Sequence, residues 1–553
     1  MTRPGGRILV DQLELHGAEI AFGVPGESYL AVLDALHDSP IRYVVCRHEV
    51  GAANMADAYG KLTGRPGICM VTRGPGATHA SGGIHTAFQD STPLILLIGQ
   101  VGREMLGREA FQEIDYRQMF GPMAKWVAQI DEVERIPELT ARAFHVATSG
   151  RPGPVVLALP EDMLVEEADV DDAAPYVPTQ THPGADDLAR MRELLQDALR
   201  PLVIVGGQPW SSAAHDELAA WCEAGELPIA ASFRCQDYVD NDSPAYAGHL
   251  TLGQDPRLAA RVRDADVLLV VGDRLSEITT AGYTLLEVPR PKQTLIHVHP
   301  DPDELARVYE PELAIAAGPV QFAAALRGVP TLDGSAWGEA TAQARAEYLE
   351  NLRHTPQPGD LDLGEVMEHL RARLPDDSIM TNGAGNFSVW EHRFYEFHTY
   401  RTQLAPTSGS MGYGVPAAVA AKLVEPDRIV LAFAGDGDFM MTGQELATAV
   451  QYGAAIVVLV IDNGMLGTIR MHQERHYPGR VSGTDLVNPD FTALAQAYGA
   501  FGERVDRTAD FAAALERALA SGKPALLHLV VDPEAITPRQ TLTELREQAL
   551  AKS

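Results

Sequence analysis

Short, continuous apolar runs recur along the chain and alternate with amphipathic stretches. They lie at residues 94–98, 155–159, 202–205, 267–271, 429–433, 456–461 and 526–531. A strand in a parallel sheet appears as such a run because helices cover the sheet on both faces. The pattern therefore predicts an α/β fold built from doubly wound parallel sheets.

Two stretches interrupt this alternation. Residues 166–187 are acidic, contain proline and have few large apolar side chains, and residues 330–360 mix Gly, Pro and charges around one helical run. Both are typical of linkers. They divide the chain into expected domains at 1–165, 188–328 and 360–535, followed by a tail at 536–553. The tail holds a predicted helix at 541–551 that could also serve as a lid.

Charge and composition narrow the possible partners. The 553 residues carry a net charge of −31, from 44 basic and 75 acidic side chains. Such a surface repels nucleic acid and anionic membranes, so neither is expected as a partner. The apolar runs are too short to span a bilayer, and the N-terminus lacks the apolar stretch of a signal peptide. The four cysteines show neither metal-ligand spacing nor a disulfide framework, so we expect a cytoplasmic protein.

The strongest chemical signal lies in the third predicted domain. The strand at 429–433 leads into Gly435-Asp436-Gly437-Asp438, a helical stretch follows at 442–452, and the next strand ends at Asp462-Asn463. Ligands of parallel sheets bind beyond the carboxyl ends of the strands. Asp436 and Asn463 would there offer oxygen ligands to a hard cation, and the glycines would admit a phosphate. Taken alone, Gly-Asp-Gly is more often only a turn.

The stretch GDGDFMMTGQEL…VIDNGMLGTI resembles the motif of thiamine-diphosphate enzymes. That motif closes with Asn-Asn, whereas this chain has Asp462-Asn463. The resemblance assigns a magnesium ion to Asp436, Asn463 and the backbone oxygen of Met465, with the ion bridging to the diphosphate. The resemblance also implies that the chain folds into a pyrimidine-binding domain, a central domain and a diphosphate-binding domain.

A second signal lies where the strand at 41–46 meets a helix expected to start near Gly51. A lone glutamate at such a junction is usually solvated or favours the helix dipole. However, RHEVGAANMADAYG resembles the catalytic segment of the same family, which implies that Glu49 is the catalytic residue. Its carboxyl group would hydrogen-bond the aminopyrimidine and favour the tautomer that removes the thiazolium proton.

Further residues follow from the resemblance. The loop at 407–412 would grip the pyrimidine, and the loop at 382–386 would contact the diphosphate. In the family the catalytic glutamate and the metal motif meet across a dimer interface, which implies a homodimer or homotetramer. The residues expected to bind the cofactor are Gly383, Ala384, Gly385, Asn386, Gly409, Met411, Gly435, Gly437 and Asp438.

Segments at 23–27, 73–101 and 109–115 resemble the acetolactate synthase-like branch. This implies decarboxylation of a 2-oxo acid followed by transfer of the acyl carbanion to a second carbonyl. Three alternatives stay open: a 2-oxo acid decarboxylase, a 2-hydroxyacyl lyase, and a catalytically silent cofactor-binding protein. A lyase for coenzyme A thioesters would need a basic patch near the central domain or the tail, where the sequence shows only scattered arginines.

The same branch suggests which residues border the substrate. His79 stands where the branch has Asn, and His472 where the true synthase has Trp, so a more polar or acidic substrate is indicated. The expected substrate residues are Gly26, His79, Gln100, Phe111, Gln112, Lys125 and His472.

The central domain resembles a nucleotide-binding fold that holds FAD in true acetolactate synthases. The matching strand ends read DRLSE at 273–277 and HPD at 299–301. Flavin-binding relatives have further acidic and basic residues at these two places, and this chain lacks them. Pro300 also has no N–H to donate. We therefore expect no FAD.

Overall fold

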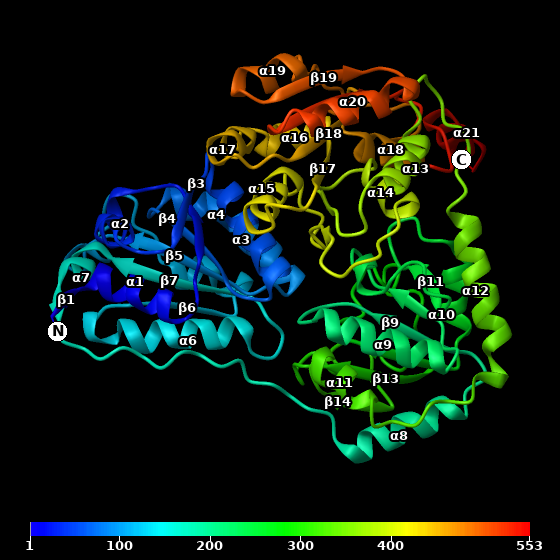
Figure 1. Cartoon of the computed structure of the whole chain (residues 1–553), viewed down its shortest axis with the longest axis horizontal. Helices are drawn as coiled ribbons and strands as arrows, with labels where there is room; N and C mark the ends of the chain where they lie inside the picture. The colour runs from blue at the N-terminus through cyan, green and yellow to red at the C-terminus, as the bar shows by residue number, and fades with distance from the viewer. Residues whose placement is uncertain (1, 553) are drawn as a thin grey trace.

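Three six-stranded parallel sheets, each covered by helices, make up the computed structural model, which describes residues 2–552. Figure 1 shows the N-terminal domain at the left, the central domain at the lower right and the C-terminal domain at the top. The predicted fold class is confirmed. Among residues 2–552, no helix combines the length and apolar character needed to cross a bilayer.

The N-terminal sheet has the strand order β3-β2-β4-β5-β7-β6, and a short antiparallel pair, β1 and β8, lies beside it. Its strands are β1 (Arg3–Pro4), β2 (Ile20–Gly23), β3 (Arg42–Val45), β4 (Gly67–Val71), β5 (Leu94–Gln100), β6 (Trp126–Gln129), β7 (Pro154–Pro160) and β8 (Glu167–Ala168). Its helices are α1 (Gly5–Leu15), α2 (Leu30–His37), α3 (Glu49–Thr63), α4 (Pro75–Asp90), α5 (Tyr116–Phe120), α6 (Ile136–Thr148) and α7 (Glu161–Val165).

The central sheet has the order β11-β10-β9-β12-β13-β14. Its strands are β9 (Pro201–Val205), β10 (Ile229–Ala231), β11 (Tyr246–His249), β12 (Val267–Val271), β13 (Thr294–His299) and β14 (Leu313–Ala316). The helices here are α8 (Ala185–Gln196), α9 (Ser212–Ala224), α10 (Pro256–Asp264), α11 (Pro319–Leu326) and α12 (Gly338–Asn351). The segment between β8 and α8 runs without helix or strand, along the lower side of the molecule in Figure 1.

The C-terminal sheet has the order β16-β15-β17-β18-β20-β19. Its strands are β15 (Ile379–Asn382), β16 (Gln403–Leu404), β17 (Val430–Gly435), β18 (Val457–Asp462), β19 (Phe501–Val505) and β20 (Ala525–Val530). Its helices are α13 (Leu363–Arg373), α14 (Ser388–Phe394), α15 (Gly414–Val424), α16 (Asp436–Thr442), α17 (Glu445–Tyr452), α18 (Gly467–His476), α19 (Phe491–Tyr498), α20 (Thr508–Ala520) and α21 (Leu542–Lys552).

Two helix starts differ from the prediction. The helix expected at 442–452 is two helices, and the first begins at Asp436 itself, so the presumed turn is a helix N-terminus. The helix expected near Gly51 begins at Glu49, because the His48 ring caps it by accepting from the Val50 N–H. Both acidic side chains therefore sit in a first turn, where backbone N–H groups favour negative charge.

The N-terminal and C-terminal domains share one apolar core, formed largely where α3 packs on α15. Alanines line both helices, which lets their backbones approach closely. A buried ion pair reinforces the contact: the Lys61 ammonium lies 3.1 Å from Asp57 and also bonds Asp90. Asp90 in turn accepts from the Thr407 N–H at 2.7 Å. The helix that begins with Glu49 is thus tied to the 407–412 loop.

Glu391 on α14 is fully buried, and neither of its carboxyl oxygens has a hydrogen-bond partner within residues 2–552. Burial raises the pKa of Glu391 from its ordinary value of 4.5 to about 8, and the nearby Arg234 guanidinium offsets part of that rise. The folded chain therefore binds this proton more tightly than the unfolded chain does. The contribution of this proton to the free energy of unfolding is fully present below pH 4.5 and is lost as the pH rises toward 8.

Glu391→Gln should remove this dependence. Between about pH 5 and 8 the wild type is expected to lose up to about 1.4 kcal/mol per pH unit relative to the variant. Scanning calorimetry across that range measures the difference, with the exposed Glu547→Gln as the control. Parallel melting curves for wild type and Glu391→Gln at every pH would contradict the assignment.

Candidate active site

Asp436 and Asn463 follow neighbouring strands at the carboxyl edge of the C-terminal sheet. β17 pairs with β18 in parallel register, with Gly435 opposite Ile461. Asp436 is buried, and its carboxylate accepts from the Gly437 N–H and the Asn488 amide, both at 2.8 Å. The side-chain oxygen of Asn463 accepts from the Met465 N–H at 3.2 Å.

Asp462, the departure from the family motif, has partners of its own. One carboxylate oxygen lies 2.8 Å from His528 Nε2, and the other accepts from Asn488 at 2.9 Å. The Asn488 amide therefore bridges Asp462 and Asp436 and fixes the orientation of both carboxylates. Sequence reasoning missed Asn488 and His528, which lie in a loop and on a neighbouring strand and carry no local motif.

The residues at this edge fit a magnesium ion and a diphosphate. A carboxylate, an amide oxygen and a backbone carbonyl are the donors that a hard cation prefers. Burial raises the pKa of Asp436 to about 6, so a cation beside it would compensate the cost of burying its charge. A Cβ at Gly435 would lie 2.9 Å from the Phe387 ring, and one at Gly437 would lie 2.8 Å from Leu466. Only glycine leaves the backbone here open to a phosphate.

Asp438 connects the two loops expected to hold the cofactor. Its carboxylate accepts from the Ala384 N–H at 3.1 Å and from the Gly412 N–H at 2.8 Å. A Cβ at Gly383 would collide with the same carboxylate. Burial raises the pKa of Asp438 to about 7. Gly409 adopts a φ of +68°, with no described atom within 4 Å of a Cβ placed there, so its backbone is open to a ligand.

Asn386 is placed differently from its neighbours in the 383–386 loop. Its amide donates to the Ile536 carbonyl at 2.8 Å and accepts from Thr468 at 2.8 Å. The side chain thus fastens the start of α14 to α18 and to the C-terminal segment.

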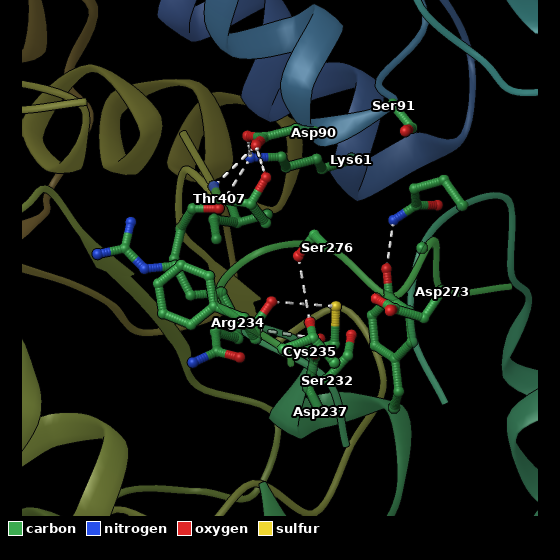
Figure 2. Close-up of a pocket in the computed structure, with 18 of the residues that line it drawn as sticks. Lys61, Asp90, Ser91, Ser232, Arg234, Cys235, Asp237, Asp273, Ser276 and Thr407 are labelled. Carbon is green, nitrogen blue, oxygen red and sulfur yellow. Dashed lines mark hydrogen bonds and ion pairs between the residues drawn. The ribbon is translucent and has the colours of Figure 1, made fainter. Parts of the chain in front are cut away.

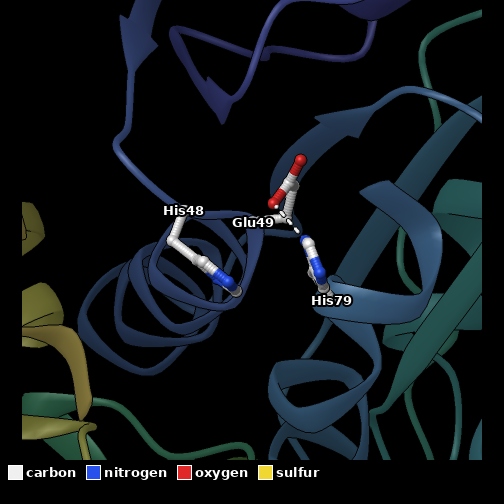
Figure 3. A group of neighbouring side chains, drawn as sticks. All are labelled: His48, Glu49 and His79. Atoms are coloured by element: carbon white, nitrogen blue, oxygen red, sulfur yellow. Dashed lines mark hydrogen bonds and ion pairs between the residues drawn. The ribbon is translucent and has the colours of Figure 1, made fainter. Parts of the chain in front are cut away.

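Glu49 projects from the first turn of α3 with 12% of its side chain exposed. One of its carboxylate oxygens lies 3.0 Å from His79 Nδ1 on α4, and the rings of His48 and His79 are 4.6 Å apart (Figure 3). His79, which the sequence predicts to face the substrate, therefore contacts the predicted catalytic residue itself.

Glu445 on α17, which sequence reasoning missed, holds the start of α3 in place. It is buried and accepts from the backbone N–H groups of Arg47, at 3.1 Å, and His48, at 2.9 Å. A Cβ at Gly51 would collide with the same carboxylate. The C-terminal domain thus fixes the backbone from which Glu49 projects.

A cavity of about 1130 Å³ lies between the central and C-terminal domains, and His85 and Gln89 of the N-terminal domain also line it. Asp436, Asn463, Met465 and Met411 line it, together with residues of the 384–388 loop and of the C-terminal segment. Over the described chain, Glu49 is not among the lining residues. Within one chain the predicted catalytic residue and the metal motif therefore face different spaces.

Of the predicted substrate residues, His472 lines this cavity from α18. The other six belong to the N-terminal domain and do not line it. The Lys125 ammonium binds the carbonyls of Val146 and Ser149 at the end of α6, at 2.6 and 2.5 Å. Gln100 is buried and donates to the Ile114 carbonyl, whereas Phe111 is 74% exposed. The six residues Gly26, His79, Gln100, Phe111, Gln112 and Lys125 are thus not brought to the metal motif by the fold of one chain.

A second, smaller cavity of about 70 Å³ lies where the three domains meet (Figure 2). Asp273 and Gly207 border it from the ends of β12 and β9, and Lys61 and Asp90 border it from the N-terminal domain. Arg234 crosses between domains here, donating to the Gly383 carbonyl at 3.0 Å and to the Pro406 carbonyl. The central domain therefore also supports the two loops that are expected to bind the cofactor.

Comparison with known proteins gives full-length matches. Family models match for the N-terminal TPP binding domain of thiamine pyrophosphate enzymes (residues 3–119), their central domain (188–326) and their C-terminal TPP binding domain (383–529). The probable acetolactate synthase large subunit of Methanocaldococcus jannaschii is 32% identical over 97% of this chain and 93% of its own length. The acetolactate synthase large subunit of Corynebacterium glutamicum is 33% identical over 96% and 87%. The acetolactate synthase isozyme 2 large subunit of Escherichia coli is 32% identical over 96% and 95%. The chain belongs to the thiamine pyrophosphate enzyme family.

Proposed function

We propose that this chain is a magnesium- and thiamine-diphosphate-dependent carboligase that acts on 2-oxo acids in the manner of acetolactate synthase. The observation that carries the proposal is the pairing of Asp436 with Asn463 at adjacent strand ends, beside a cavity large enough for cofactor and substrate. The names of the full-length relatives support the reaction.

Each residue then has a defined task. Asp436, Asn463 and the Met465 carbonyl hold the magnesium ion, and the backbone around Gly383, Gly435 and Gly437 accommodates the diphosphate. When bound, thiamine diphosphate would supply an electron sink that stabilises negative charge on the former carbonyl carbon of the substrate. Glu49 holds and moves the proton at the aminopyrimidine, and Met411 supports the cofactor from the 407–412 loop. Asp438 keeps the two loops at a fixed separation.

We propose that a second copy of the chain completes the site. Glu49 does not border the cavity that the metal motif lines, which supports its supply by another subunit. Exposed apolar side chains on both domains support an interface: Met440 and Met441 on α16 are 50% and 51% exposed, and Phe111 is 74% exposed. A homodimer or homotetramer follows. The buried, unpaired cysteines suit a cytoplasmic location.

Product analysis with pyruvate, alone and with an aldehyde acceptor, tests the reaction. Acetolactate from pyruvate supports the carboligase. Acetaldehyde as the main product would replace it with a decarboxylase. If neither appears but a 2-hydroxyacyl thioester is cleaved, the chain is a lyase.

His472 should influence which 2-oxo acid is accepted. It lines the cavity, and burial together with Arg475 and His476 lowers its pKa, so the ring is neutral near pH 7 and can donate a hydrogen bond to a carbonyl or carboxylate. His472→Trp is expected to change the ratio of kcat/KM between pyruvate and 2-oxobutanoate by about tenfold, the scale of one lost polar contact. Cofactor affinity, measured by titration, should change far less. An unaltered substrate ratio would show that His472 does not face the substrate.

We further propose that the purified protein carries no FAD. The Asp273 carboxylate accepts a hydrogen bond from the Leu275 N–H at 2.6 Å, and the His299 ring accepts one from the Asp301 N–H at 3.1 Å. Both side chains therefore already have partners within the chain. A colourless concentrated protein that releases no flavin on denaturation is the expected result. A yellow protein with about one flavin per chain would overturn it.

A further inference from the structure

Three arginines that lie far apart in the sequence line the outer part of the 1130 Å³ cavity. Arg393 comes from α14, Arg475 from α18 and Arg539 from the segment before α21. Figure 1 shows these elements together at the right of the C-terminal domain, above the end of α12. In a chain with a net charge of −31, such a cationic group is not a general feature of the surface.

Asn351, the last residue of α12, makes two of these guanidinium groups converge. Arg393 donates to its backbone carbonyl at 2.9 Å, and Arg539 donates to its side-chain oxygen at 2.9 Å. A further nitrogen of Arg393, Nη1, is buried and has no hydrogen-bond partner within residues 2–552. A donor that is buried without an acceptor costs stability, so this position is suited to an acceptor from a ligand.

The charges around these arginines leave a positive excess. Burial, together with the nearby positive charges of Arg539 and Arg257, lowers the pKa of Arg393 to about 10. Asp255 is the carboxylate that acts on Arg393 in the opposite direction, but two hydrogen bonds from the Arg257 guanidinium, at 3.2 and 2.8 Å, already hold it. Glu350 also pairs with Arg257. An added anion would relieve the repulsion between the guanidinium groups of Arg393 and Arg539.

This cationic group lies within the same cavity as the metal motif but away from it. Arg393 lies in the second turn of α14, beyond the 384–388 loop that also lines the cavity. The cavity of about 1130 Å³ also exceeds the usual range for small-molecule sites, about 300–1,000 Å³. A substrate longer than pyruvate could therefore reach from the reacting carbonyl to the arginines.

We propose that Arg393, Arg475 and Arg539 form a subsite for an anionic group at the end of the substrate remote from the reacting carbonyl, either a carboxylate or a phosphate ester. This inference rests on the proposed function and names the substrate class for it. Guanidinium groups bind both anions through paired N–H donors.

The test uses the holoenzyme with pyruvate as donor and three aldehyde acceptors. Propanal carries no charge, succinic semialdehyde carries a distal carboxylate, and glyceraldehyde 3-phosphate carries a distal phosphate. We expect kcat/KM for one of the two anionic acceptors to exceed that for propanal by at least about tenfold, equivalent to about 1.4 kcal/mol. Which acceptor is preferred identifies the anion.

Arg539→Gln and Arg475→Gln are expected to reduce that preference by about tenfold each, the scale of a lost charge-assisted contact. Arg480→Gln removes the same charge from an exposed arginine that does not line the cavity, and it should leave the preference unchanged. No preference in the wild type, or equal effects of Arg539→Gln and Arg480→Gln, would overturn the subsite while leaving the carboligase intact.

If no 2-oxo acid yields a product, the proposed function fails, and binding then tests the subsite alone. Calorimetric titration of the wild type with succinate and with glycerol 3-phosphate should show binding of one of them that Arg539→Gln weakens and Arg480→Gln does not. Absence of binding, or equal binding by all three proteins, would overturn the inference.

Discussion

Asp436→Ala is expected to abolish retention of thiamine diphosphate through gel filtration. The carboxylate supplies the charged ligand of the proposed magnesium site, and without the bridging cation the diphosphate meets a buried edge that already holds Asp462. Loss of residues that only support metal ligands costs about 10- to 100-fold in affinity, so loss of a ligand should cost more than about 100-fold. The measured quantity is the amount of thiamine diphosphate that stays bound per chain after gel filtration in a buffer that contains magnesium.

Asp485→Ala provides the control. Its carboxylate is 83% exposed on the strand bridge beside Met465, so the variant removes one negative charge nearby without touching the metal motif. It should retain the cofactor like the wild type. If the wild type and Asp436→Ala both kept thiamine diphosphate bound through filtration in EDTA, no such metal site would exist.

The parts of the structure that could be predicted are those in which local sequence determines geometry. The buried strands are continuous apolar runs, and the order of parallel sheets places Asp436 and Asn463 at one edge. The fold class follows from these features, and the family follows from the resemblance of the stretches around Glu49 and Asp436 to known motifs. The helix at Asp436 could not be predicted in the same way, because a Gly-Asp-Gly sequence suits both a turn and a first helical turn.

The remaining parts depend on contacts between residues distant in sequence. Glu445 binds the backbone before Glu49 across 397 positions, and Asn488 joins two carboxylates from a loop. Arg393 and Arg539, which the sequence shows only as scattered arginines, converge on Asn351 because α12 ends beside α14. Arg393 and Arg539 thus form a basic group near the tail, which their separate positions in the sequence do not predict and which suits a charged substrate.

Glu49→Gln is expected to slow hydrogen exchange at the thiazolium carbon by about 100-fold or more, the usual scale for loss of a general acid–base group. The amide has nearly the same shape but cannot take up and release the proton. The His48 cap and the Glu445 contacts that position α3 stay intact, so metal and cofactor content should not change. Exchange followed by NMR on the loaded protein measures the effect, and a wild-type rate would remove Glu49 from the mechanism.

A mixture of the two inactive variants separates a shared site from one built within a single chain. If Glu49 of one subunit serves the metal site of another, a dimer of one Glu49→Gln chain and one Asp436→Ala chain has one site in which both residues are intact. Its other site lacks both. Random reassociation makes half of the dimers mixed, so activity should return to about a quarter of the wild-type value. Continued inactivity of a mixture shown to contain mixed dimers would mean that each chain uses its own Glu49, and a large rearrangement between the N-terminal and C-terminal domains would then be required to bring it to the cavity.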